Sequence, residues 1–308
     1  MSTRVILSRM ARAMATLWLV VTLVFVLLRV SGDPLLVLLP DDTDPRTVEV
    51  YRERWGLDRP LLVQYGYYVA NVVRGDLGRS LRDGREAIDI VIERVPKTLQ
   101  LGLSALLVGV LLGIPAGTVA ALRRGTFIDR TLMTISVLGY SVPTYFLGVL
   151  LILLFSLTLR WLPSAGSGTL SHLVMPAMTL GAWIAASLAR FTRSAVLDVL
   201  ERPYMRTARA KGLTRLAQIA QHAFPNAAIP IVTLLGITIG HLIAGSVVIE
   251  TVFAWPGVGR LTVTSVTSRD LAIVQTIVLL VAAAMVTSNL VVDLLYSWLD
   301  PRIRSTRQ

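Results

Sequence analysis

The chain has 308 residues, of which 54% are hydrophobic and 16% charged, with a formal net charge of +11 and a mean hydropathy of +0.66. Soluble domains carry roughly 25% charged residues, so the composition excludes an ordinary soluble protein and predicts an all-α polytopic membrane protein. The absence of cysteine excludes disulfides, thiolate metal sites and cysteine nucleophiles. In a membrane chain this positive charge is typical of cytoplasmic loops, and no nucleic-acid partner is expected.

Long runs without Asp, Glu, Lys or Arg indicate the membrane spans. A helix needs roughly 20 mostly apolar residues to cross the hydrocarbon core, because lipid offers no partner for exposed backbone groups. The sequence predicts six transmembrane helices on this criterion. The runs are residues 13–28, 98–122, 131–159, 161–189, 216–249 and 271–292.

The first run follows Arg4, Arg9 and Arg12, as the apolar part of a signal peptide would. Residues 30–33 after it offer no small-residue cleavage site, so we interpret the run as a retained first helix. An even number of spans then places both termini on the same side of the membrane.

Charge asymmetry predicts which side is cytoplasmic. The N-terminus, the loop 123–130, the segment 190–215 and the C-terminal tail are rich in arginine, whereas residues 31–97 and 250–270 are close to neutral. Cytoplasmic loops carry the excess of Lys and Arg, so both termini are predicted to be cytoplasmic. A large extracytoplasmic loop then joins helices 1 and 2.

Residues 31–97 form the large polar stretch of the chain. Their alternating polar and apolar residues predict short amphipathic helices at about 44–56 and 61–74, followed by a turn at residues 75–78. Two interpretations stay open for this stretch. It is either a self-contained cap over the pore mouth or a docking and gating surface for an external solute-binding partner.

Helices 2 and 5 carry small residues at a spacing of four. Such residues let another helix backbone approach closely, which indicates helix packing or, alternatively, contacts at which two halves of a gate slide. They are Ala105, Gly109, Gly113, Gly117, Gly236 and Gly240. Pro143, Pro176 and Pro230 disfavour straight helices in the spans that contain them.

The segment 199–226, called the elbow below, is amphipathic at helical spacing up to Lys211. Gly212 breaks this pattern, a second short helix follows, and Pro225 is expected to close it. The pattern predicts a helix–turn–helix at the cytoplasmic membrane surface. The elbow either lies on anionic lipid as a basic amphipathic helix or serves as a lever gripped by another protein.

The elbow resembles the cytoplasmic signature of binding-protein-dependent ABC permeases, which is an E-A-A triplet, three residues, a glycine, nine residues and I-x-L-P. Here the triplet is residues 206–208, the glycine is Gly212 and the closing element is residues 222–225. Arg206 in place of the acid and His222 in place of isoleucine depart from the general pattern. The letters TARAKG around the glycine are similar to the peptide and nickel branch.

Further motifs of that branch occur in order along the chain. They are GDP at 32–34, GLD-x-P at 56–60, GDLG-x-S at 75–80, LGIP-x-G at 112–117, ETVF-x-x-PG-x-G at 250–259 and DPR at 300–302. Together they make the chain similar to the DppB/OppB-type permeases of dipeptide and oligopeptide importers. The resemblance implies a type I ABC importer permease fold in the bacterial inner (plasma) membrane.

The resemblance also implies how the chain is divided. Residues 1–30 would be the cytoplasmic N-terminus and helix 1, and residues 31–96 the extracytoplasmic cap region. Residues 97–297 would be the permease core, which includes the elbow, and residues 298–308 the cytoplasmic tail.

The implied function is half of a translocation pore, without catalysis by this chain. The implied partners are a second, DppC/OppC-like permease subunit, two cytoplasmic ATPase subunits, an extracytoplasmic solute-binding protein and membrane lipids. ATP and Mg would bind to the ATPase subunits, because this chain has no G-x-x-x-x-G-K-[ST] motif. No cofactor or metal is expected in this chain.

The motifs supply two sets of candidate residues. Those expected to couple to an ATPase are Arg206, Thr207, Ala208, Arg209, Lys211, Gly212, His222, Phe224 and Pro225. Those expected in extracytoplasmic docking or gating are Gly32, Asp33, Pro34, Gly75, Asp76, Gly78, Glu250, Pro256, Gly257 and Gly259.

Other functions are less consistent with the sequence. An ion-coupled secondary transporter would need ionisable groups at mid-membrane, where the sequence places essentially His241. A membrane enzyme would need a nucleophile–base pair or a metal cluster, and His172, His222 and His241 lie in different regions. The substrate stays open among dipeptides, oligopeptides, glutathione and nickel chelates, because no selective charged ring is visible.

Overall fold

The computed structural model describes residues 3–30, 58–80 and 82–299, with a few isolated positions between 44 and 53. The side chains of residues 239–245, 291–299 and a few others lie outside the description. All regular structure in the described part is helical, apart from one isolated bridge between Arg79 and Glu86. The candidates at 32–34, the predicted helix at 44–56 and the tail from 300 lie outside the described residues or almost entirely so.

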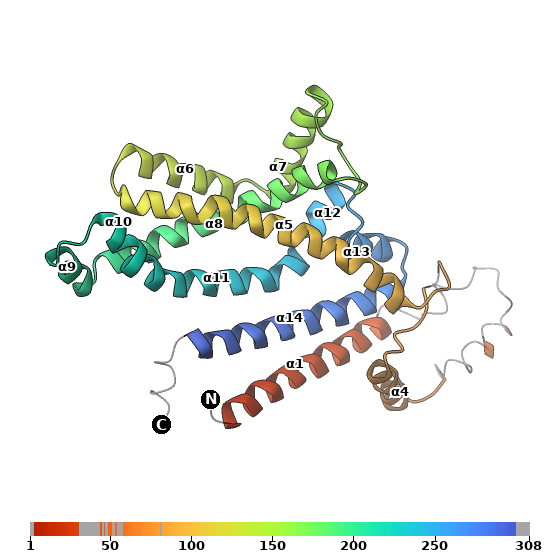
Figure 1. Ribbon diagram of the computed structural model, residues 1–308. Helices are drawn as coiled ribbons and strands as arrows, with labels where there is room; N and C mark the ends of the chain where they lie inside the picture. Colours follow the sequence, from red (N-terminus) through yellow and green to blue (C-terminus); the bar gives the residue numbers. More distant parts are fainter. Residues whose placement is uncertain are drawn as a thin grey trace. The chain divides into compact units, whose positions relative to one another are not determined.

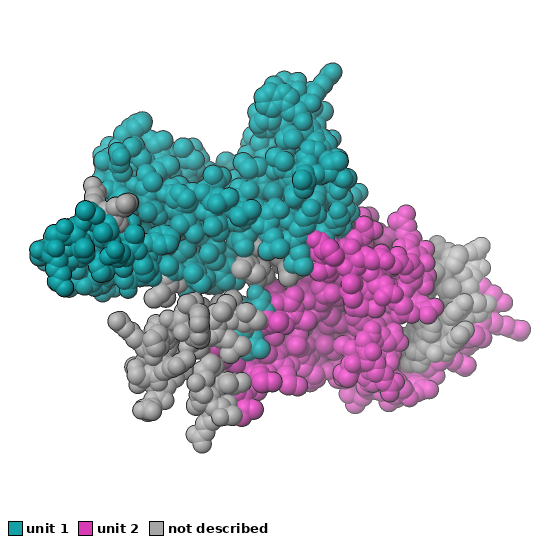
Figure 2. All heavy atoms as spheres, viewed as in Figure 1, with its two compact units in different colours: residues 1, 97–260, 288–308 teal, residues 2–96, 261–287 magenta. Residues whose placement is uncertain are grey.

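The chain divides into two compact units, shown in Figure 2. Unit 1 comprises residues 97–260 and 288–308 together with Met1, and unit 2 comprises residues 2–96 and 261–287. One boundary between the units falls between Pro96 and Lys97, inside the long helix α5 (Ala87–Leu122).

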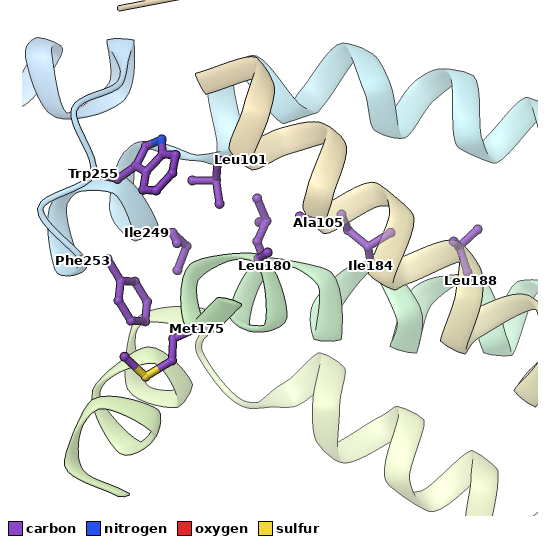
Figure 3. Packing of buried hydrophobic residues seen from close by; sticks show 10 residues of the cluster. Leu101, Ala105, Met175, Leu180, Ile184, Leu188, Ile249, Phe253 and Trp255 are labelled. Carbon is purple, nitrogen blue, oxygen red and sulfur yellow. The ribbon is translucent and has the colours of Figure 1, made fainter. Parts of the chain in front are cut away.

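Unit 1 is a helix bundle arranged around α8. Its long helices are drawn in Figure 1 as α5 (Ala87–Leu122), α6 (Phe127–Ser141), α8 (Leu170–Leu200) and α11 (Phe224–Gly245). α8 contacts α6, α11 and the short helices α7 (Thr144–Leu151) and α12 (Val247–Val252). Apolar residues of α5, α8, α12 and the turn after α12 form a buried core, which Figure 3 shows around Leu101, Leu180, Ile184, Phe253 and Trp255.

Three glycines of α5 lie directly against α8. A Cβ added to Gly113 would lie 2.6 Å from the carbonyl oxygen of Ala185, and Cβ atoms on Gly109 and Gly117 would overlap Ile184 and Ala189. Because glycine has no Cβ, the two backbones approach more closely than larger residues would allow. Ala105 is fully buried in the same contact, whereas the surroundings of Gly240 on α11 lie outside the described residues.

The predicted span 131–159 is bent rather than straight. α6 ends at Ser141, α7 begins at Thr144, and the two halves meet at an angle of 99°. Pro143 cannot donate a backbone hydrogen bond, and Val142 before it is extended, as residues before proline usually are. α7 continues into a π-helix, η1 (Ile152–Thr158).

The predicted span 161–189 is shifted along the chain. α8 begins at Leu170, where Thr169 and His172 cap its first turn, and it continues to Leu200. Arg190 and Arg193 therefore lie inside this helix. The span was predicted from charge-free residues alone, so it did not predict how far the helix itself continues.

The elbow has the predicted helix–turn–helix form, with one correction. α9 (Pro203–Ala210) is followed by a turn and by α10 (Arg215–Gln218), which runs through a π-helix, η2 (Ile219–Ala223), into α11. Pro225 does not close the segment but lies in the first turn of α11, where a missing N–H is tolerated. The same missing donor accounts for the irregular hydrogen bonding of η2 just before it.

Unit 2 contains α1 (Thr3–Val30), α4 (Leu61–Arg74), most of α13 (Val258–Thr267) and the first part of α14 (Leu271–Leu299). α4 confirms the helix predicted at 61–74. It packs on α1 through the hydroxyls of Thr22 and Tyr65, 2.7 Å apart, and through an edge-to-face contact between Phe25 and Tyr65.

Among the described residues, four helices are long and apolar enough to cross a membrane: Leu7–Leu27, Ala87–Leu122, Leu170–Leu200 and Leu271–Leu290. The bent pair formed by α6, α7 and η1 counts as a fifth if both halves belong to one span. This agrees with a polytopic helical protein, while the number of six spans and the side on which the termini lie stay predictions.

Candidate functional site

The elbow presents a polar surface and buries its apolar side. Met205 and Ala208 of α9 are buried against the bundle, whereas Arg206, Thr207 and Lys211 are exposed. This arrangement follows from the spacing, because residues three apart lie on one face of a helix. Of the four predicted coupling residues on α9, Arg206 and Thr207 are therefore exposed at the end of unit 1, whereas Ala208 is buried.

The turn of the elbow depends on Gly212. Its φ of +75° lies in the left-handed region, which side chains with a Cβ disfavour. The turn is held by hydrogen bonds from the Lys211 N–H to the Thr207 carbonyl and from the Gln218 side chain to the Leu213 carbonyl. A Cβ on Gly212 would meet no atom within 4 Å, so the space in front of the glycine is open in this chain.

A cavity of about 840 Å³ lies beside the elbow. Its lining residues are Ala121, Leu122, Arg124, Leu197, Leu200, Glu201, Arg206, Gln218 and Ile219. An ion pair between Arg124 and Glu201, 2.7 Å apart, joins the loop after α5 to the end of α8. Both partners are largely exposed, so this pair contributes little to stability and mainly orients the two segments.

A second, more buried ion pair joins α6 to α8. Asp129, 4% exposed, accepts hydrogen bonds from Nε and Nη2 of Arg193 at 2.7 and 2.9 Å and from the Gly125 N–H. A bidentate pair of this kind fixes the geometry of both helices. The loop 123–126, the start of α6 and the last turns of α8 therefore form a braced base from which α9 extends.

The motif ETVF-x-x-PG-x-G surrounds a buried carboxylate. Glu250 has no exposed surface, and its Oε1 accepts hydrogen bonds from Thr98 Oγ1 at 2.8 Å and Ser246 Oγ at 2.9 Å. Its Oε2 accepts the Arg260 N–H at 2.9 Å. Thr98 in turn accepts the Val258 N–H. We call these residues the Glu250 cluster; it ties α12, the start of α13 and α5 together.

The glycines of this motif make room for the Glu250 cluster. A Cβ on Gly257 would overlap the Glu250 carboxylate, and one on Gly259 would lie 2.5 Å from Val247 Cα. Trp255 in the turn between α12 and α13 ties this turn to α5, because its Nε1–H donates to the Lys97 carbonyl at 2.8 Å. Pro256 lies in the same turn.

The motif GDLG-x-S also ends in a buried hydrogen bond. Gly75 and Gly78 have φ of +81° and +87°, and the Gly78 N–H donates to the Asp76 carboxylate. Ser80 Oγ then donates to Asp270 Oδ2 at 2.6 Å, just before α14. This segment is therefore fixed to the start of α14 within unit 2.

The predicted coupling residues of the elbow differ in their exposure. On the elbow, Arg206, Thr207, Lys211 and Gly212 are all exposed, whereas His222 is half-buried on η2. Phe224 and Pro225 are exposed at the start of α11, and the Arg209 side chain lies outside the described residues. The sequence did not indicate Thr98 and Ser246 as partners of Glu250. It also did not indicate the pairs Asp129–Arg193, Arg124–Glu201 and Ser80–Asp270.

Two family matches cover most of the chain. Residues 113–305 match the family described as the binding-protein-dependent transport system inner membrane component. Residues 2–102 match the family that describes the N-terminal part of such membrane components.

Similar proteins share the sequence almost from end to end. The glutathione transport system permease protein GsiC of Escherichia coli strain K12 is 42% identical over 300 residues, which cover 97% of this chain and 98% of GsiC. The GsiC protein of Shigella dysenteriae serotype 1 has the same identity and coverage.

Two solved structures share the fold at low sequence identity. An inward-facing structure of the MetNI methionine ABC transporter has a TM-score of 0.55 and 22% identity, covering 68% of this chain and 96% of that chain. An amino acid ABC transporter crystallised with histidines has a TM-score of 0.56 and 18% identity, covering 68% and 94%.

Proposed function

Because the chain belongs to the family of binding-protein-dependent transport system inner membrane components and is a permease subunit of an ABC importer, we propose that it imports short peptides. Glutathione, which is itself a tripeptide, is the first solute to test. The similarity to GsiC over 97% of the chain carries this part of the proposal.

We further propose that an ATPase subunit grips the elbow. The supporting observation is the outward surface of Arg206, Thr207 and Lys211 around the open space in front of Gly212. Since α9 extends from the braced base at the end of α8, a displacement of α9 would be passed to α8 and, through the Asp129–Arg193 pair, to α6. The ATPase subunits would bind ATP and Mg, and their closure would rock the bundle as a rigid body.

The remaining partners follow from the same family. A homologous second permease subunit would complete the pore, and an extracytoplasmic solute-binding protein would deliver the peptide. This proposal also places the elbow on the cytoplasmic side of the membrane, because the arginine-rich segments of a membrane protein usually lie there.

Reconstitution of the complete complex in proteoliposomes tests the function. We expect binding protein loaded with glutathione or a dipeptide to stimulate ATP hydrolysis several-fold and to drive uptake of that solute, because closure of the ATPases depends on the loaded partner. A nickel chelate offered in the same way serves as the comparison. Uptake driven by a proton gradient without ATP would contradict the proposal and favour an ion-coupled carrier.

A further inference from the structure

The C-terminal half of α8 carries polar side chains on its exposed side, which is unusual for a membrane helix, although Val174, Met178 and Phe191 of α8 are also exposed. Trp183, Arg190 and Ser194 are exposed and Ser187 is half-buried. Their spacing of four, three and four places them in one narrow stripe along the helix. The exposed stripe of α5 differs completely, because it consists of Leu99, Leu103, Leu107 and Leu111. The α5 stripe suits contact with lipid, whereas the α8 stripe suits contact with water or solute.

Arg190 and Trp183 of this stripe form a cation–aromatic cluster with Tyr140 of α6. The guanidinium carbon of Arg190 is 4.4 Å from the centre of the Tyr140 ring. Tyr140 stacks in turn on Trp183, with ring centres 6.0 Å apart and an angle of 19° between the planes. Within the described part of the chain, Arg190 has no carboxylate or hydrogen-bond partner that would neutralise it.

The cluster lies far along α6 from the start of that helix. Tyr140 is 13 residues after the start of α6, which corresponds to about 20 Å along the helix axis. Arg190 precedes Arg193, which pairs with Asp129 near that start, so the Arg190 side chain reaches away from the arginine-rich end toward Tyr140. An arginine whose role was to reach lipid headgroups would extend in the opposite direction.

We propose that the α8 stripe faces the aqueous pathway and that Arg190, with Tyr140 and Trp183, binds the carboxylate of a peptide in transit. This inference rests on the proposed function and adds a subsite to it. A guanidinium holds a carboxylate through two parallel hydrogen bonds, and the aromatic rings cover the apolar part of the solute. The exposure of the three side chains makes the contact weak and reversible, as transport requires.

The fluorescence of Trp183 provides a direct test. The complete permease–ATPase complex is placed in phosphatidylcholine nanodiscs without binding protein and titrated with reduced glutathione or with acetyl-Gly-Gly-amide, which has no carboxylate. The difference between the unaltered complex and Trp183→Phe isolates the signal of Trp183. We expect glutathione, but not the amide, to change this signal.

Arg190 variants show whether the guanidinium is responsible. Arg190→Gln should raise the half-saturating glutathione concentration roughly tenfold or more, since a charge-assisted hydrogen bond is lost. Arg190→Lys should recover part of the binding, and Arg130→Gln, a control at the start of α6, should have no effect. A titration unchanged by Arg190→Gln would overturn the subsite, as would a signal that appears only after anionic lipid is added.

Uptake by the unaltered complex separates this inference from the proposed function. If glutathione or dipeptide is transported but Arg190→Gln leaves the titration unchanged, the subsite alone is wrong. If the unaltered complex transports no peptide, the proposed function itself is wrong.

Discussion

Replacing Gly257 with alanine is expected to lower the free energy of unfolding of the permease by about 2 kcal/mol, because an added methyl group overpacks a buried site. The methyl carbon would occupy the space of the Glu250 carboxylate. Displacing this carboxylate would leave the hydroxyls of Thr98 and Ser246 without their buried acceptor. Size-exclusion chromatography after heating the detergent-purified complex measures the loss as a lower midpoint temperature.

A matched glycine provides the control for this prediction. Gly66 lies on α4, where a Cβ would meet no atom within 4 Å. Gly66→Ala should therefore be neutral or slightly stabilising, since alanine favours a helix more than glycine does. Equal midpoints for Gly257→Ala and Gly66→Ala would show that the Glu250 cluster does not stabilise this part of unit 1.

Replacing Gly212 with valine is expected to reduce solute-dependent uptake tenfold or more while the protein still inserts into the membrane and assembles. A β-branched residue at a φ of +75° strains the turn by at least about 1–2 kcal/mol and moves α9 relative to α10. The side chain would also enter the open space in front of the turn. Uptake and ATP hydrolysis measured together should show that hydrolysis no longer depends on the loaded binding protein.

Two further variants separate strain from contact. Gly212→Asn keeps the left-handed turn at low cost but adds a side chain, so a partial loss of coupling indicates that the space is occupied by a partner. Gly84→Val introduces the same kind of strain at a φ of +66°, far from the elbow in sequence, and should leave coupling unchanged. Normal coupling in Gly212→Val would show that the elbow does not transmit the ATPase movement.

Hydrophobic spacing and single glycines in the sequence were enough to predict short helices and turns. The helix at 61–74 and the turn at Gly212 follow from hydrophobic spacing and from a glycine that interrupts it, and the structure contains both. Six motifs in order along the chain resemble one permease branch and indicated the family. The similarity to GsiC over 97% of the chain then confirmed this family.

Long-range contacts could not be predicted in this way. The partner of Glu250 is Thr98, 152 residues earlier, and the partner of Asp129 is Arg193, 64 residues later. One available signal was that Glu250 is a carboxylate in an otherwise apolar stretch, which indicates a buried acceptor without naming its donors. The length of α8 was not predicted, because the span was taken from charge-free residues alone, whereas a helix accepts Arg190 and Arg193 when Tyr140 and Asp129 lie opposite.

Site-specific cross-linking from the elbow tests the central claim most directly. The chain has no cysteine, so Lys211→Cys introduces a single reactive thiol on the exposed turn. In the assembled complex, a short thiol-to-amine linker at this position should join the permease to an ATPase subunit, and nucleotide should change the yield. Arg160→Cys, an exposed position before α8, should give no such product. A complex that contains the ATPase yet gives no product from Lys211→Cys would contradict the proposal that the ATPase acts through the elbow.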